Sequence, residues 1–343
     1  MRCHPVRSAF HSVGGAIRVA LGLLVVASSP FVVTHLDPAG KYRGLPATLA
    51  RGGFIAEELH KAEPLDVLVI GQSRVWSGID TDFLQTQLPG VRAAIFAANA
   101  SGPDMWYAML HDALAHRTVK LLVLEADLHR NFDREMPHPF VSWWWDISYP
   151  SEGLGVRQRL ALLGLSYIGA PRRLLGALRT GARDWPAISG EAGSLGPTNF
   201  STRGDPPPPD LAMRELPVAE TLIDPRDATR ARYLDEEVTP FEQHCLDNLL
   251  DLARANGTRV VFVYLPRAPW RAEDGFPRGI QVPRWTTRLR DTRIMGVDLS
   301  TWTTDEIGSA FVDLEHLGAI GARRYMIALL PAFRHLLDLE AAP

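Results

Sequence analysis

Ser73 lies two residues after the end of a largely apolar run, in the sequence GQSR. The preceding segment 65–71 (LDVLVIG) is apolar apart from Asp66, which predicts a strand buried on both faces of a parallel sheet. A serine at the carboxyl end of such a strand could attack a carbonyl carbon, and its own N–H could help to stabilise the oxyanion. A serine that only caps the following helix has the same sequence pattern, so Ser73 alone does not decide between the two interpretations.

A second group of candidate catalytic residues lies near the C-terminus, in the sequence FVDLEHLG. Asp313 and His316 are three residues apart, just ahead of a predicted helix, so they can meet on one side of a tight turn. The carboxylate would then fix the imidazole tautomer and stabilise the cation formed when the ring accepts a proton. Because a serine hydroxyl needs such a base to be nucleophilic at neutral pH, Ser73, Asp313 and His316 are candidates for a catalytic triad. A surface D-x-x-H without this role is the alternative.

The elements that must position these residues alternate between strand and helix. The predicted strands are 65–71, 93–97, 119–124, 259–265 and 294–299, and the predicted helices are 81–88, 106–116, 240–256 and 317–337. This alternation predicts an α/β fold with a doubly wound parallel sheet, in which ligands bind at the carboxyl ends of the strands.

The segment between the third and fourth predicted strands is far longer than an ordinary crossover. It contains a tryptophan cluster at 143–145, an Ala/Leu/Arg-rich helix near 156–180 and then a Gly/Pro-rich stretch. We interpret residues 126–235 as an aromatic-rich insertion or cap over the sheet. Its tryptophans could line the site, and core or membrane-surface positions are the alternative for them.

Basic residues precede an uncharged apolar run at the N-terminus. Arg2, Arg7 and Arg18 come before residues 19–33, in the order typical of an export signal whose positive end stays in the cytoplasm. Extended over 16–36, the run approaches the roughly 20 apolar residues that a spanning helix needs. We predict an uncleaved signal anchor. A cleaved signal, which would give a secreted form, and a buried helix of a soluble protein are the alternatives.

The domain organisation follows from this anchor. Residues 1–36 are predicted to be a cytoplasmic tip and signal anchor, 37–63 a linker and lead-in helix, and 64–343 a domain on the extracytoplasmic, periplasmic side of the cell membrane. The chain has two cysteines, Cys3 and Cys245, which would then lie on opposite sides of the membrane and could not pair.

Composition narrows the functional classes. The chain of 343 residues is 46% hydrophobic and 22% charged, as in ordinary globular proteins, and its formal net charge is −3. Mixed charges disfavour a nucleic-acid partner, which requires a concentrated basic face. The sequence contains neither a nucleotide-binding glycine pattern nor a repeated metal-ligand spacing, so we expect no cofactor and no metal.

Together, the serine after the first strand and the D-x-x-H before the last helix resemble the SGNH (GDSL-like) hydrolase superfamily. Block I of that family is G-D-S and block V is D-x-x-H, and the resemblance spans about residues 64–340. It implies a three-layer, flavodoxin-like parallel sheet and a serine-dependent esterase or O-acyltransferase. Ser73, Asp313 and His316 would be its catalytic residues.

The intermediate blocks of this family are only partly present. Gly102, in the sequence NASG, resembles the block II glycine, so the resemblance implies an oxyanion hole formed by the N–H groups of Ser73 and Gly102. The block III pattern G-x-N-D has no counterpart, because the chain reads EADL after the third strand. We prefer Asn99 over Asn131 as the substitute for the missing asparagine. A carboxylate facing an oxyanion would oppose catalysis, so Asp127 is expected to point elsewhere.

A particular branch of the superfamily is also similar. The sequences GQSR, GID, NASG and VFVYLP resemble those of anchored SGNH proteins of bacterial envelopes, including alginate O-acetylation and teichoic-acid D-alanyl transfer proteins. This resemblance implies an acylated cell-envelope polysaccharide or similar ester as substrate, and a membrane-bound O-acyltransferase as partner. Because Gln72 replaces the block I aspartate and the block III asparagine is absent, a non-catalytic polysaccharide-binding or assembly protein with the same fold is the alternative.

Three further residues are candidates for substrate binding. Arg74, beside the nucleophile, could bind an anionic polymer, and capping of local carbonyl groups is the alternative. Arg267 follows the fourth strand and could line the cleft. Trp76, three residues after the serine, is the third candidate.

Overall fold

The structure of this chain is a computed structural model. It describes residues 20–24, 42, 55, 57–59, 61–99, 101–128, 154–160, 221–227, 231–234, 238–268, 280–289, 292–299, 302–313 and 315–339.

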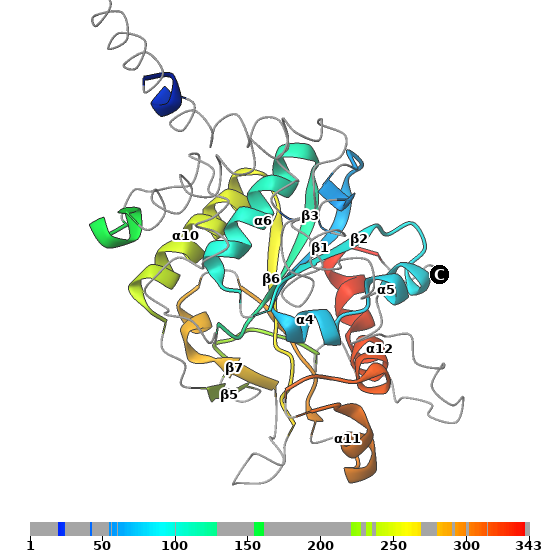
Figure 1. The fold of residues 1–343 in the computed structure, drawn as a ribbon. Helices are drawn as coiled ribbons and strands as arrows, with labels where there is room; N and C mark the ends of the chain where they lie inside the picture. Colours follow the sequence, from blue (N-terminus) through cyan, green and yellow to red (C-terminus); the bar gives the residue numbers. More distant parts are fainter. Residues whose placement is uncertain are drawn as a thin grey trace, which may run out of the picture.

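A six-stranded sheet forms the centre of the fold, with the strand order β2-β1-β3-β6-β8-β4 (Figure 1). All neighbouring strands are parallel except β4, which pairs antiparallel with β8 at the edge. The strands are β1 Leu65–Gly71, β2 Ala93–Ala97, β3 Val119–Glu125, β4 Leu222–Ile223, β6 Arg259–Val263 and β8 Ile294–Met295. The predicted α/β fold with a parallel sheet is therefore confirmed, and the order of its parallel strands is the flavodoxin-like one.

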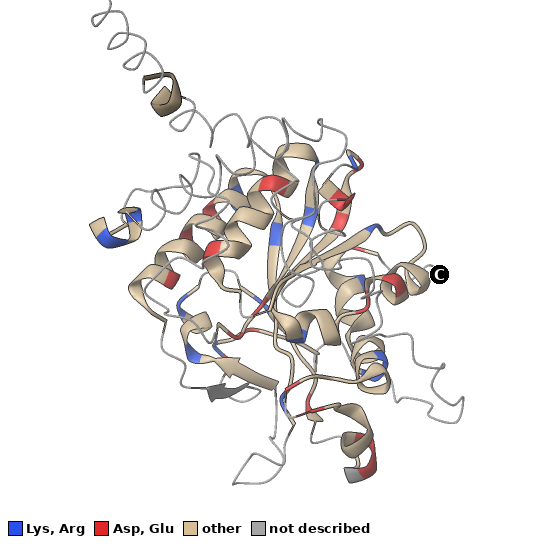
Figure 2. Cartoon of the chain, viewed as in Figure 1, with Lys and Arg blue, Asp and Glu red and all other residues tan. Residues whose placement is uncertain are grey.

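Helices cover both faces of the sheet, because residues of β1 alternate between two apolar layers. Leu68 and Ile70 pack with α6 and α10, whereas Val67 and Val69 face the layer that contains α5 and α12. The helices are α4 Ser73–Gly78, α5 Thr81–Gln87, α6 Pro103–His116, α10 Pro240–Ala255, α11 Thr304–Ala310 and α12 Ala319–Leu336. Acidic and basic residues are interspersed along these elements (Figure 2).

A second, smaller sheet pairs β5 (Ala231–Leu234) in parallel with β7 (Ile280–Pro283), and the 3-10 helix η2 (Arg284–Arg288) follows β7. Sequence patterns did not predict this pair. The same holds for β4, which comes from the predicted insertion 126–235 but joins the edge of the main sheet. A two-residue strand is too short to show an apolar period, so only pairing with β8 makes it recognisable.

Several predicted boundaries differ from the observed ones. Helix α6 begins at Pro103 rather than at residue 106, because Gly102 is its N-cap and proline suits the first helical turn. The predicted strand 294–299 is paired only over Ile294–Met295. Of the predicted insertion, residues 126–128, 154–160, 221–227 and 231–234 are described, and the tryptophan cluster lies outside the described residues.

Most of the predicted anchor lies outside the described residues as well, as does Cys3. Residues 20–24 are helical, and within the described parts of the chain no helix is both long and apolar enough to cross a membrane. In the predicted linker and lead-in helix, Tyr42, Ile55 and Leu59 are buried in the core layer of α6 and α10. Cys245, on α10, is a buried cysteine.

The start of α12 packs tightly against the end of α11. A Cβ atom on Gly321 would lie 2.0 Å from the carbonyl oxygen of Ala310. The Gly321→Ala variant is therefore expected to lower the free energy of unfolding by about 2–3 kcal/mol, as an overpacked core does. Urea unfolding measures this loss.

Gly308→Ala is the matched control for this prediction. A Cβ atom there meets no described atom within 4 Å, and the residue lies inside helix α11. Alanine should therefore be neutral or stabilising by about 0.5–1 kcal/mol. Equal stabilities for the two variants would contradict the close contact between α11 and α12.

Candidate active site

Strand β1 places Ser73 at the carboxyl edge of the sheet. Strand β1 is hydrogen-bonded to β2 on one side and to β3 on the other, so this strand lies in the interior of the sheet. The chain then turns at Gln72, and Ser73 is the first residue of α4. Gln72 and Arg74 are buried while Ser73 is only half-buried, so the serine is the accessible residue of this turn.

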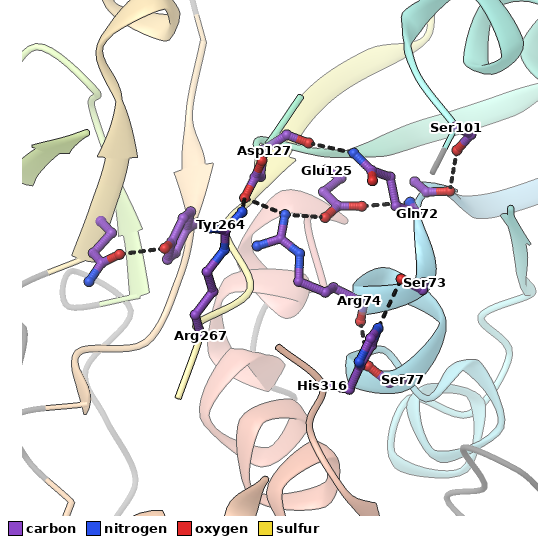
Figure 3. A network of polar contacts seen from close by, with 12 residues as sticks. Gln72, Ser73, Arg74, Ser77, Ser101, Glu125, Asp127, Tyr264, Arg267 and His316 are labelled. Carbon is purple, nitrogen blue, oxygen red and sulfur yellow. Dashed lines mark hydrogen bonds and ion pairs between the residues drawn. The ribbon is translucent and has the colours of Figure 1, made fainter. Parts of the chain in front are cut away.

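The three predicted triad residues lie within hydrogen-bonding distance of one another. Nε2 of His316 is 2.9 Å from Oγ of Ser73, although the two residues are 243 positions apart in the sequence (Figure 3). On the other side of the ring, Nδ1 is 2.8 Å from Oδ2 and 3.0 Å from Oδ1 of Asp313. This chain of contacts is the one required for a serine nucleophile, a general base and a carboxylate that orients the base.

The D-x-x-H segment forms a self-contained turn. Oδ1 of Asp313 accepts hydrogen bonds from the backbone N–H groups of Glu315, at 2.7 Å, and His316, at 2.8 Å. Burial would raise the pKa of Asp313, but these bonds and the His316 ring together hold that pKa below its ordinary value. Asp313 is therefore an acceptor-only carboxylate at neutral pH, although its side chain is half exposed.

The turn after β2 packs beside the nucleophile turn. The carbonyl of Gly71 accepts hydrogen bonds from Ala98 N, at 3.1 Å, and from Ser101 Oγ, at 3.1 Å. Ser101 in turn accepts a bond of 2.9 Å from the indole of Trp106. The predicted oxyanion donors Asn99 and Gly102 lie on this same turn, and the alternative Asn131 lies outside the described residues.

A buried ionic network lies behind Ser73 (Figure 3). Nη2 of Arg74 is 2.8 Å from Oε1 of Glu125 and 2.5 Å from Oδ2 of Asp127. The same Asp127 oxygen is 2.9 Å from Nη2 of Arg267. Gln72 adds two bonds, from its backbone N–H to Oε2 of Glu125 at 2.6 Å and from its side chain to the carbonyl of Asp127 at 3.1 Å.

Burial and ion pairing shift the pKa values of Glu125 and Arg74 in opposite directions, and the balance differs between the two residues. Burial raises the pKa of Glu125 to about 7, although Arg74 favours its charged form. For Arg74, burial lowers the pKa, but attraction to Glu125 and Asp127 outweighs it, so the pKa lies above its ordinary value. Two arginines facing two carboxylates satisfy the requirement that buried charges be paired.

The three predicted substrate-binding residues differ in burial and in contacts. The guanidinium of Arg74 is buried among carboxylates, which is at odds with both predicted roles, binding an anionic polymer and capping local carbonyls. Arg267 lies at the edge of the network and keeps 39% of its side chain exposed, so it can reach a ligand. Trp76, on α4, is partly buried against the layer of α5 and α12.

Sequence patterns led to an expectation about Asp127 but to none about Glu125. Asp127 is ion-paired with Arg74 and Arg267, in keeping with the expectation that its carboxylate has another task than facing an oxyanion. Sequence reasoning missed the role of Glu125. The available signal was a single carboxylate that ends the apolar run 121–124 of strand β3, with an arginine directly after the candidate nucleophile.

Comparison with known proteins adds no identification. No protein-family model and no curated protein matches the sequence. The described residues include no group of three or more His, Cys, Asp or Glu that could hold a metal ion. Fold and site together define an α/β protein with a Ser-His-Asp arrangement at the carboxyl edge of its sheet.

Proposed function

We propose that this protein is a serine-dependent esterase or O-acyltransferase of the SGNH type. The observation that carries the proposal is the distance of 2.9 Å between Ser73 Oγ and His316 Nε2, with Asp313 bound to the opposite ring nitrogen. A serine that only capped a helix would need no imidazole at its hydroxyl and no carboxylate behind that imidazole.

The proposed reaction proceeds through an acyl-enzyme. Ser73 Oγ attacks an ester carbonyl carbon while His316 Nε2 takes its proton, and Asp313 stabilises the resulting imidazolium. The N–H groups of Ser73 and Gly102, with the side chain of Asn99, stabilise the oxyanion. His316 then returns the proton to the departing alcohol oxygen. In the second half, His316 takes the proton of a water molecule or a sugar hydroxyl as that oxygen attacks the acyl carbon, and it returns the proton to Ser73 Oγ as the bond between Oγ and the acyl group breaks.

The acylated cell-envelope polysaccharide, or a similar ester, is the proposed substrate class. Its support is the resemblance of GQSR, GID and NASG to anchored envelope proteins, together with the export-type N-terminus. The same resemblance supports a periplasmic location, attachment to the membrane by the N-terminal segment, and a membrane-bound O-acyltransferase as partner. Arg267 is the partly exposed cation at the site edge that could contact an anionic sugar.

A non-catalytic polysaccharide-binding or assembly role is the second candidate. It is favoured by Asp127, which stands where the resemblance expects an asparagine donor and is ion-paired with two arginines. Loss of one oxyanion donor costs about a hundredfold in rate and does not abolish catalysis. Because the Ser73, His316 and Asp313 contacts are all in place, we favour the enzyme.

The decisive experiment is labelling of the purified full-length chain with a fluorophosphonate probe. An activated serine displaces fluoride and becomes covalently phosphonylated, so we expect labelling of the wild type and none of Ser73→Ala. Ser77→Ala is the matched control, since Ser77 lies on the same helix and its hydroxyl donates to the carbonyl of Arg74. That variant should be labelled. A folded wild type that resists the probe would favour the binding protein.

A further inference from the structure

One carboxylate contacts the residues on both sides of the candidate nucleophile. Oε2 of Glu125 accepts the backbone N–H of Gln72 at 2.6 Å, and Oε1 accepts Nη2 of Arg74 at 2.8 Å. Gln72 and Arg74 flank Ser73. Glu125 is fully buried at the end of β3, so strand β3 holds the turn that follows the neighbouring strand β1 (Figure 3).

The backbone also approaches this carboxylate closely. A Cβ atom on Gly71 would lie 2.8 Å from Oε2 of Glu125 and 2.4 Å from Cγ2 of Val75. Only glycine therefore allows the turn to lie against Glu125. A buried carboxylate is costly unless it is paired and hydrogen-bonded, and here its two partners are the two neighbours of Ser73.

We propose that Glu125 is a positioning residue for Ser73. By fixing Gln72 and Arg74, it holds the serine hydroxyl 2.9 Å from His316 Nε2. This inference rests on the proposed acyl transfer. A displacement of about 1 Å at a reacting group can cost on the order of a hundredfold in rate, so a clamp on both neighbours of the nucleophile has a kinetic consequence.

Glu125→Gln tests the inference because glutamine keeps the shape but loses the charge. Its amide oxygen can still accept the Gln72 N–H, while its NH₂ group faces the guanidinium of Arg74 and cannot accept from it. The experiment follows fluorophosphonate labelling of the full-length chain at about pH 8.5, which is above the raised pKa of Glu125 of about 7. The labelling rate at saturating probe is expected to fall about 10- to 100-fold, with the dissociation constant of the probe unchanged.

Asp112→Asn is the matched control. Like Glu125, Asp112 is a buried carboxylate, and it accepts a hydrogen bond from the buried hydroxyl of Tyr42. Asp112 lies near the C-terminal end of α6, at the opposite end of the helix from Gly102. This variant should lose stability and still be labelled at the wild-type rate. Arg74→Lys is a second test that keeps the positive charge but changes the planar donor group, and its labelling rate is expected to fall as well.

The outcomes separate this inference from the proposed function. If Glu125→Gln is labelled at the wild-type rate and only the labelled fraction decreases, the residue supports folding alone and the positioning role is refuted. If the folded wild type is not labelled, the proposed function fails and the positioning role fails with it. Slow labelling of Glu125→Gln beside rapid labelling of Asp112→Asn supports the positioning role.

Discussion

Replacing His316 by alanine is expected to lower kcat for p-nitrophenyl acetate hydrolysis by about 10⁴- to 10⁶-fold, the range found when a triad base is removed. The physical reason is the contact of 2.9 Å between Nε2 and Ser73 Oγ, which is the only route we assign for the serine proton. KM should change little, because the imidazole acts on the proton rather than on substrate binding. Steady-state kinetics measure both constants.

His335→Ala is the control for this variant, since His335 is an exposed histidine in the last turn of α12. It should keep wild-type kinetics. Added imidazole should restore part of the activity of His316→Ala, because a small base can enter the space left by the ring. Unchanged kcat in His316→Ala would remove the general base from the mechanism.

Asp313→Asn is expected to lower kcat by about 10⁴-fold through the imidazole tautomer. Oδ1 already accepts two backbone N–H groups, so the asparagine oxygen must occupy this position. The NH₂ group then replaces Oδ2, 2.8 Å from His316 Nδ1, and donates to it. The ring proton moves to Nε2, which can no longer accept the proton of Ser73.

Asp305→Asn is the matched control, because Asp305 is an exposed carboxylate in the first turn of α11 with no place in the proposed site. Its kcat should equal that of the wild type. Thermal unfolding should show that Asp313→Asn is folded, since the two backbone bonds to Oδ1 are retained. If the folded Asp313→Asn variant keeps its activity, the carboxylate does not set the tautomer.

The two halves of the site differ in how they are built. The D-x-x-H turn is local: Asp313 accepts N–H groups two and three residues ahead, and Val312 bonds to the His316 carbonyl at 3.0 Å. The nucleophile turn is instead fixed by residues of neighbouring strands, through Ser101 after β2 and Glu125 at the end of β3. A substitution far from Ser73 in the sequence can therefore alter its position.

The sequence by itself determined the features that depend on local order. The apolar strand 65–71 ending in a glycine, the serine after it and the three-residue spacing of Asp313 and His316 were readable because strand period and turn length act over a few residues. The alternation of strands and helices likewise predicted the α/β fold, since buried parallel strands need helical crossovers.

Only the tertiary structure decided which distant residues meet. The contact of Ser73 with a histidine 243 positions away depends on α12 packing beside α4, and the pairing of Arg74 with Glu125 depends on β3 lying next to β1. The sequence left the task of Arg74 open between a ligand and local carbonyls, because burial cannot be read from residue type alone. In the folded chain, the guanidinium of Arg74 is removed from water, so its charge has to be paired, and Glu125 and Asp127 provide the pairing.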